Sequence, residues 1–427
     1  MKNIFAYRIL VHVARGILEK DSSLNRLVEK ISRECLPQEV TPGWEDLVRK
    51  RVELLLSPRD GTPFIQYLDH ECSRCPDDSR ACLEACPVEA IEILQGRPHI
   101  DDERCIQCGR CVDGCISGMI VEHSDLARVA HMLLEEEPVY AILAPSFVGQ
   151  FGSASPGQIR GALEKLGFAH VYEVAMAADI ITTLEAQEFY RRYHAGKPFM
   201  ITSCCCPAFI KLIEKHRPKL THIVSDAVSP MVALGRLLHH REPSCRVVFI
   251  GPCVAKKAEA KRAELADAVD AVLTFKETQA LLEAAQMEDL TAMPSRPLED
   301  AARGGRNFAY SGGVTEAIKT ALADLDASIE LIGVYGNGLQ ECSQLLKEIE
   351  AGELEANFME GMACRGGCVG GPGTIIDAER GKAHVQAFAG ESPLISATAN
   401  HRALQWVQHF PREKLLSTKV KLRVPIS

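Results

Sequence analysis

Seventeen cysteines, most of them gathered in short runs, are the residues of this 427-residue chain that are best suited to chemistry. One run, Thr-Ser-Cys-Cys-Cys-Pro at 202–207, contains Cys204, Cys205 and Cys206 and lies where an apolar strand should give way to a helix. Because adjacent side chains diverge, a single metal atom would not take all three thiols, and at least one is free for other chemistry. The run therefore needs partner cysteines from elsewhere in the chain.

Two further motifs supply those partners. Cys253 follows an apolar stretch, and Cys364 and Cys368 are four residues apart, a spacing that would put both on one face of a helix. One thiolate from the first run, one from the second motif and two from the third make four, which is the ligand set of a 4Fe-4S cubane. The three motifs therefore predict a cubane held by distant parts of the chain.

Eight more cysteines lie between residues 72 and 115, in two successive runs of four. The pattern resembles that of bacterial two-cluster ferredoxins, in which the fourth cysteine of each run ligates the other cluster. That rule assigns one 4Fe-4S cluster to Cys72, Cys75, Cys82 and Cys115, and the second to Cys86, Cys105, Cys108 and Cys111. The first run departs from the pattern in the residues that separate its second and third cysteines, which puts the loop shape in doubt but not the ligand count. Structural zinc is the alternative, but the second run and the proline after Cys86 fit ferredoxins better.

The elements that must position these cysteines follow from the apolar pattern. Beyond residue 130, strands expected at 139–143, 170–174, 199–202, 247–250, 269–273 and 331–334 alternate with helices expected at 159–166, 180–193, 207–216, 231–239 and 313–325. This alternation predicts an α/β fold with substantially parallel sheets. Since such sheets bind ligands at the carboxyl ends of their strands, Cys204–Cys206 and Cys253 lie where a site is expected.

Three regions are expected: a helical segment at 1–70 with two or three helices, a ferredoxin-like α+β domain at 71–125, and an α/β domain at 126–427. A composition of 46% hydrophobic and 25% charged residues is typical of a soluble globular protein. The net charge of -9 argues against a nucleic-acid partner, because phosphate backbones usually need a basic face. The clustered cysteines favour metal ligation over disulfides.

The first residues do not read as a signal peptide, because Arg8, His12 and Arg15 interrupt the apolar stretch. No apolar run reaches the ~18 residues that a membrane span needs. We therefore expect a cytoplasmic protein.

Taken together, the three cysteine motifs resemble the signature motifs of iron-only (FeFe) hydrogenases, and they occur in that family's order. The resemblance implies an FeFe-hydrogenase-type H-cluster domain, whose cofactor is a 4Fe-4S cubane joined through one cysteine to a diiron centre with carbon monoxide, cyanide and azadithiolate ligands. The implied cubane ligands are Cys206, Cys253, Cys364 and Cys368, of which Cys368 also bridges to the diiron centre.

The resemblance also assigns the surroundings of the diiron centre. Lys256 is expected to hydrogen-bond a cyanide, as a buried ammonium would. Phe308 and Met362 match residues that line the pocket, and Ala144 and Pro145 match a loop at its edge.

A proton route is implied by the same resemblance. Glu185, Glu188 and Arg192 share one face of the helix expected to begin near Asp179, a spacing that by itself usually marks a solvated, salt-bridged surface. Their match to the family's proton path, which adds Ser225 and a cysteine beside the cubane ligand, favours the relay.

Two departures from the family pattern lie beside the expected centre: the extra cysteine in the first motif, and Gly251 where the second motif usually has methionine. The intervals to the downstream prolines place the inserted residue before Cys206. Cys205 then takes the place of the proton-relay cysteine, and Cys204 is an extra thiol near the cofactor. A bulge that exchanges Cys204 and Cys205 is the alternative. The departures indicate a less-studied branch of the family.

The expected activity is reversible hydrogen oxidation and proton reduction, with electrons passing through two additional 4Fe-4S clusters to a ferredoxin or similar soluble carrier. Maturation proteins for the diiron centre are expected partners. A hydrogen or redox sensor of the same family is one alternative. An iron–sulfur assembly protein without a diiron centre is another, which the retained Lys256, Phe308, Met362 and relay residues disfavour.

Overall fold

The computed structural model describes residues 4–35, 44–57, 63–68, 80–115, 118–197, 199–202 and 205–416. Cys72, Cys75 and Cys204 therefore lie outside the described residues. Within the described part, no helix combines the length and apolar character that crossing a membrane would require.

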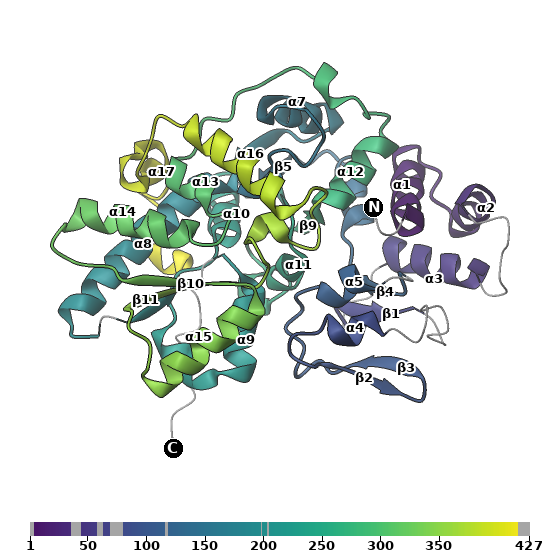
Figure 1. Cartoon of the computed structure of the whole chain (residues 1–427). Coiled ribbons are helices and arrows are strands. Elements are labelled where there is room, and N and C mark those ends of the chain that lie inside the picture. The colour runs from purple at the N-terminus through teal and green to yellow at the C-terminus, as the bar shows by residue number, and fades with distance from the viewer. Residues whose placement is uncertain are drawn as a thin grey trace.

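A four-stranded parallel sheet forms the centre of the larger part of the molecule (Figure 1). Its strand order is β6-β5-β8-β9. The strands are β5 (Val139–Leu143), β6 (His170–Glu173), β8 (Arg246–Gly251) and β9 (Ala271–Thr274). Every residue of β5 is buried, as expected of a parallel strand covered on both faces.

A second parallel sheet, of order β10-β11-β7, lies beside the first. Its strands are β7 (Met200–Thr202), β10 (Gly333–Asn337) and β11 (Phe358–Met362). The helices that accompany the two sheets are α6 (Leu126–Met132), α7 (Pro156–Leu166), α8 (Val174–His194), α9 (Pro207–His216), α10 (Pro230–Arg241), α11 (Val254–Ala260), α12 (Phe275–Ala284), α13 (Arg303–Asn307), α14 (Gly313–Leu325), α15 (Leu339–Ala351), α16 (Ala378–Gly390) and α17 (His401–Trp406). The predicted α/β class with parallel sheets is confirmed.

Three helices precede the sheets: α1 (Ile4–Leu18), α2 (Leu24–Cys35) and α3 (Trp44–Leu56). They confirm the predicted helical N-terminal segment. Helix α1 packs against α12 and α6, and Val13 and Ile17 on α1 belong to the same apolar core as the four-stranded sheet (Figure 1). The N-terminal helices are thus built onto the larger part of the molecule.

The cysteine-rich region between them is made of small antiparallel pairs and short helices. Strand β1 (Ile65–Tyr67) pairs with β4 (Ile120–Glu122), and β2 (Ile91–Leu94) pairs with β3 (Arg97–Ile100). Two short helices, α4 (Ala81–Glu84) and α5 (Arg110–Gly114), pack on each other. This α+β arrangement is compatible with the ferredoxin-like domain predicted there.

The structure differs from the predicted elements at several places, of which three bear on the site. The helix expected to begin near Asp179 starts at Val174, because the Asp179 carboxylate accepts hydrogen bonds from the Ala302 and Gly305 amides instead of capping its own helix. The strand expected at 331–334 begins two residues later as β10. Strand β11 was not predicted, since Glu360 interrupts its apolar run.

Candidate active site

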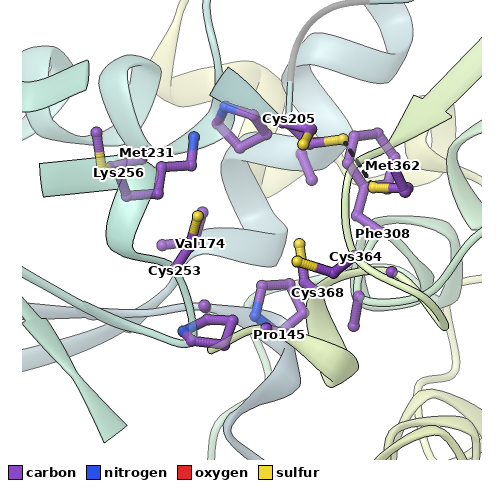
Figure 2. Close-up of a pocket in the computed structure, with 18 of the residues that line it drawn as sticks. Pro145, Val174, Cys205, Met231, Cys253, Lys256, Phe308, Met362, Cys364 and Cys368 are labelled. Atoms are coloured by element: carbon purple, nitrogen blue, oxygen red, sulfur yellow. Dashed lines mark hydrogen bonds between the residues drawn. The ribbon is translucent and has the colours of Figure 1, made fainter. Parts of the chain in front are cut away.

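All three cysteine motifs line a single pocket between the carboxyl ends of the strands (Figure 2). Strand β7 leads to Cys206, β8 to Cys253, and β11 to Cys364 and Cys368. The pocket and its opening to solvent together have an empty volume of about 680 Å³. The structure therefore brings together the four cysteines that the sequence suggested as one ligand set.

The prediction that Cys364 and Cys368 share a helix face is wrong. The chain turns between them through Gly366 and Gly367, whose φ angles of 83° and 90° lie in the left-handed region that interrupts an α-helix. A Cβ on Gly367 would also come within 2.6 Å of the Ser311 amide nitrogen. The tight turn, rather than a helix, directs both sulfurs into the pocket.

The four cysteines are half-buried and line the same pocket. Burial raises the pKa of Cys253 to about 12, and Cys206 adds to the effect. The pKa values of Cys206, Cys364 and Cys368 are raised as well, first by burial. Without a positive partner these groups stay protonated, so a cationic cluster is what would stabilise them as thiolates.

A single metal ion does not fit this arrangement. Among the described residues, no three cysteine, histidine or acidic side chains converge closely enough to hold one ion. Zinc sites need donors about 2.3 Å from a common point. Four sulfurs that line one pocket suit a polynuclear cluster instead.

The remaining pocket wall is mostly apolar and includes the predicted Ala144, Pro145, Phe308 and Met362. Its cation is Lys256, whose ammonium is buried and lies 2.6 Å from the Glu259 carboxylate. Burial opposes the charge, but Glu259 outweighs it and raises the pKa of Lys256. Lys256 is therefore positively charged inside an apolar pocket.

Ser146 was not predicted as a site residue. It follows Pro145 at the pocket edge, is fully buried, and its hydroxyl has no hydrogen-bond partner among the described residues. A buried hydroxyl without a partner loses the free energy of its hydrogen bonds to water. A ligand with acceptor atoms in the pocket would restore that loss.

The structure also explains Gly251 in the second motif. A Cβ at this position would lie 2.5 Å from the Phe249 ring, and Phe249 itself lines the pocket. Phe249 thus occupies the space that a side chain at position 251 would need.

In the first motif, Cys205 and Cys206 both line the pocket. Cys206 is the N-cap residue of α9. Its sulfur accepts a hydrogen bond of 3.4 Å from the amide of Ala363, the residue before Cys364. The Cys205 sulfur lies 3.9 Å from the Met362 sulfur (Figure 2).

The predicted relay residues lie on one face of α8. Glu188 is almost fully buried, accepts a hydrogen bond of 2.9 Å from the Ser225 hydroxyl, and forms an ion pair of 2.6 Å with Arg192. Glu185 is fully buried and accepts from the Thr202 hydroxyl at 2.9 Å. Burial of both glutamates does not fit a solvated surface. Thr202 is a site residue that the sequence analysis did not single out.

Glu360 is a further buried residue that was not predicted. Its buried carboxylate on β11 accepts from the Gly312 amide at 2.9 Å and the Thr315 amide at 2.8 Å, at the start of α14. Burial raises its pKa, and these hydrogen bonds oppose the shift. A lone acid just before the Met-Ala-Cys motif was the available signal.

The second predicted ferredoxin-like set is brought together. Burial raises the pKa of Cys111, and the next contributions come from Cys108, Cys105 and Cys86. Cys82 and Cys115, from the first set, pack in the same small core.

This second set lies next to the pocket. Gly109 packs against Val254, the residue after Cys253, and against Pro372. Cys108 is also among the neighbouring thiols that raise the pKa of Cys364. The two cysteine clusters are therefore adjacent.

Comparison with known proteins decides the family. Residues 137–372, more than half of the chain, match the family described as iron only hydrogenase large subunit, C-terminal domain. The chain belongs to that family. Membership in the iron-only hydrogenase family implies iron–sulfur clusters and an H-cluster, and the pocket's four thiols and single ammonium fit such a group.

Two hydrogenases are each 29% identical to this chain over part of its length. The NADP-reducing hydrogenase subunit HndD of Solidesulfovibrio fructosivorans is 29% identical over 333 residues, which are 64% of this chain and 56% of HndD. Iron hydrogenase 1 of Clostridium pasteurianum is 29% identical over 393 residues, 69% of this chain and 68% of that relative. The match thus spans little more than half the length of HndD.

Two further likenesses bear on fold and function. The structure of apo [FeFe]-hydrogenase HydA1 from Chlamydomonas reinhardtii, in a variant form, shares the fold with a TM-score of 0.60 at 21% identity, over 69% of this chain and 98% of that one. The cytosolic Fe-S cluster assembly factor NAR1 of Eremothecium gossypii is 40% identical over 83 residues, 19% of this chain and 18% of NAR1. A short part of this chain is therefore also similar to a protein named for iron–sulfur cluster assembly.

Proposed function

We propose that this protein catalyses the reversible oxidation of hydrogen to protons and electrons. The observation that carries the proposal is the pocket itself, in which four half-buried cysteines adjoin an apolar space that contains one buried ammonium, Lys256. A cubane alone would not need that additional space.

The residues have distinct proposed roles. Cys206, Cys253, Cys364 and Cys368 would hold the cubane of the H-cluster, and Cys368 would bridge to its diiron centre with carbon monoxide, cyanide and azadithiolate ligands. When bound, this group supplies a metal site for hydride and an amine base for the proton. Lys256 would donate hydrogen bonds to its anionic ligands. Ala144, Pro145, Phe308 and Met362 would exclude water.

Protons would pass between the pocket and the surface along Cys205, Glu185, Ser225 and Glu188, with Arg192 at the outer end. The hydrogen bond of 2.9 Å between Ser225 and Glu188 supports the outer part of this route. Thr202 would hold the Glu185 carboxylate in place. Cys204 would be an additional thiol near the cofactor.

Electrons would pass through two further 4Fe-4S clusters in the region 71–125. The cluster of Cys86, Cys105, Cys108 and Cys111 would be the nearer one, because its loop contacts the pocket's own motif. The cluster of Cys72, Cys75, Cys82 and Cys115 would exchange electrons with a soluble carrier such as ferredoxin. We also propose that the protein is cytoplasmic and that it belongs to the triple-cysteine branch of the family. Its proposed domains are residues 1–70, 71–125 and 126–427.

Iron–sulfur assembly is the competing function, favoured by the likeness to NAR1. Hydrogen–deuterium exchange separates the two, because it requires heterolytic cleavage but no electron carrier. Protein matured with the diiron centre is incubated with deuterium gas in ordinary water, and HD is measured by mass spectrometry. We expect HD formation that depends on maturation; no HD from fully matured protein would favour assembly.

A further inference from the structure

Helix α9 contacts both the active-site pocket and the nearer ferredoxin-like cysteines. Its N-cap residue is Cys206, assigned above to the cubane. Only ten residues long, it also carries Lys211, Lys215 and His216, all of which reach the loop that contains Cys105. One short helix therefore connects the two proposed clusters.

The contacts are made mainly to the loop's backbone. The Lys215 ammonium donates to the carbonyl oxygens of Asp102 at 2.6 Å and Cys105 at 2.8 Å. The His216 Nε2 atom donates to the Arg104 carbonyl oxygen at 2.9 Å. The Lys211 ammonium donates to the Gln107 side-chain oxygen, between Cys105 and Cys108. These bonds fix the loop's path and bring two ammonium groups to it.

The opposite side of the loop is held by the second cysteine motif. A Cβ at Gly109 would lie 2.9 Å from Val254, so the backbone approaches α11 as closely as glycine allows. Ile106 is fully buried in a cluster that includes Ala255. The loop is thus enclosed between α9 and the start of α11, the two helices that follow Cys206 and Cys253.

We propose that Lys211 and Lys215 are positioning residues for the cluster of Cys86, Cys105, Cys108 and Cys111, and that their charges raise its reduction potential. This inference rests on the proposed function, which supplies the cluster. Reduction adds negative charge to a cluster, and nearby cations stabilise the reduced form. The helix would hold this cluster beside the cubane and favour its reduction.

The test is a redox titration at pH 6.5, monitored by electron paramagnetic resonance, of the full chain carrying its iron–sulfur clusters but not the diiron centre. Burial lowers the pKa of Lys211 to about 8, so both lysines are charged at this pH. Lys211→Met and Lys215→Met remove one charge each, and Lys211→Arg retains it. Lys219→Met is the matched control, because Lys219 is an exposed lysine a few residues beyond α9 whose ammonium makes no described contact with the loop. Iron content is measured in every variant.

We expect each Lys→Met variant to lower the equilibrium constant for reduction of one cluster by up to about tenfold. For a one-electron step this is a fall of about 59 mV in the reduction potential. Lys211→Arg and Lys219→Met should keep the wild-type potential. If Lys211→Met loses the cluster, restored iron in Lys211→Arg would still support positioning. Wild-type potentials in both Lys→Met variants would overturn the inference. Failure of the proposed function would appear separately, as absent HD formation in matured wild type.

Discussion

Each of the four proposed cubane ligands contributes one thiol to the pocket. Replacing Cys253 or Cys364 with alanine should therefore remove the cubane and with it all hydrogen turnover. Iron should fall by about four atoms per chain, while the ferredoxin-like clusters remain. Iron analysis and electron paramagnetic resonance check this; unchanged iron in either variant would show that the ligand set is assigned wrongly.

The three adjacent cysteines should behave differently from one another. Cys206→Ala should lose the cubane, because Cys206 starts α9 inside the pocket. Cys205→Ala should keep every cluster but lose most turnover, since it removes the relay thiol. Cys204→Ala should keep the cubane, the diiron centre and activity, with an altered reduction potential or inhibitor response. If Cys204→Ala assembles fully but cannot turn over, the roles of Cys204 and Cys205 are exchanged.

Glu188 should matter as a proton carrier rather than as an ion-pair partner. Glu188→Gln should slow turnover at least tenfold with unchanged cluster spectra, because an amide keeps the shape but does not titrate. Glu164→Gln is the control, since Glu164 also pairs with an arginine one helical turn away, Arg160, but has no role in the route. If both variants turn over at the same rate, Glu188 has only a structural role in its ion pair with Arg192.

At the scale of elements, the turn between Cys364 and Cys368 determines where two of the four sulfurs lie. Gly367→Ala places a Cβ 2.6 Å from the Ser311 nitrogen, so the turn must move and the cubane iron should be lost. Gly352→Ala is the control: its φ of 72° imposes similar backbone strain, about 1–2 kcal/mol, but nothing lies within 4 Å. Full iron in Gly367→Ala would contradict this role of the turn.

The sequence predicts elements well where local signals are strong. Helices α9 and α14 agree with the predicted 207–216 and 313–325, helped by Pro207 at the first position of α9. Strand β11 escapes prediction because the buried Glu360 is satisfied by α14, which is distant in sequence. The geometry of Cys364 and Cys368 depends on two glycines whose φ angles only the fold determines.

The whole molecule shows a further limit of sequence reasoning. The sequence predicts two or three N-terminal helices, but the packing of α1 against α12 depends on contacts such as the hydrogen bond of 2.8 Å that Tyr7 donates to Glu283. The proximity of the ferredoxin-like loop to Cys253 is likewise a property of the assembled chain. The cysteine sets could be listed from the sequence, whereas their adjacency could not.

Stability of the whole molecule should depend on pH through His239. Its hydrogen bond to Asp270, together with Cys245, raises the pKa of His239 to about 9. Because the folded pKa exceeds the unfolded value of 6.5, this stabilisation is complete below pH 6.5 and is lost as pH rises through 9. His239→Gln should lower stability by no more than about 1 kcal/mol at pH 6 and by little at pH 10. Chemical denaturation at both pH values checks this, and an equal loss at both would contradict it.

The central claim is that the apolar space beside the four thiols holds a diiron centre with carbon monoxide and cyanide ligands. Infrared spectroscopy of the full chain after maturation with the diiron cofactor tests it most directly, because metal-bound carbonyl and cyanide stretches fall where proteins do not absorb. We predict both sets of bands, with the cyanide bands shifted in Lys256→Met. Their absence from protein that carries its cubane and has undergone competent maturation would contradict the account.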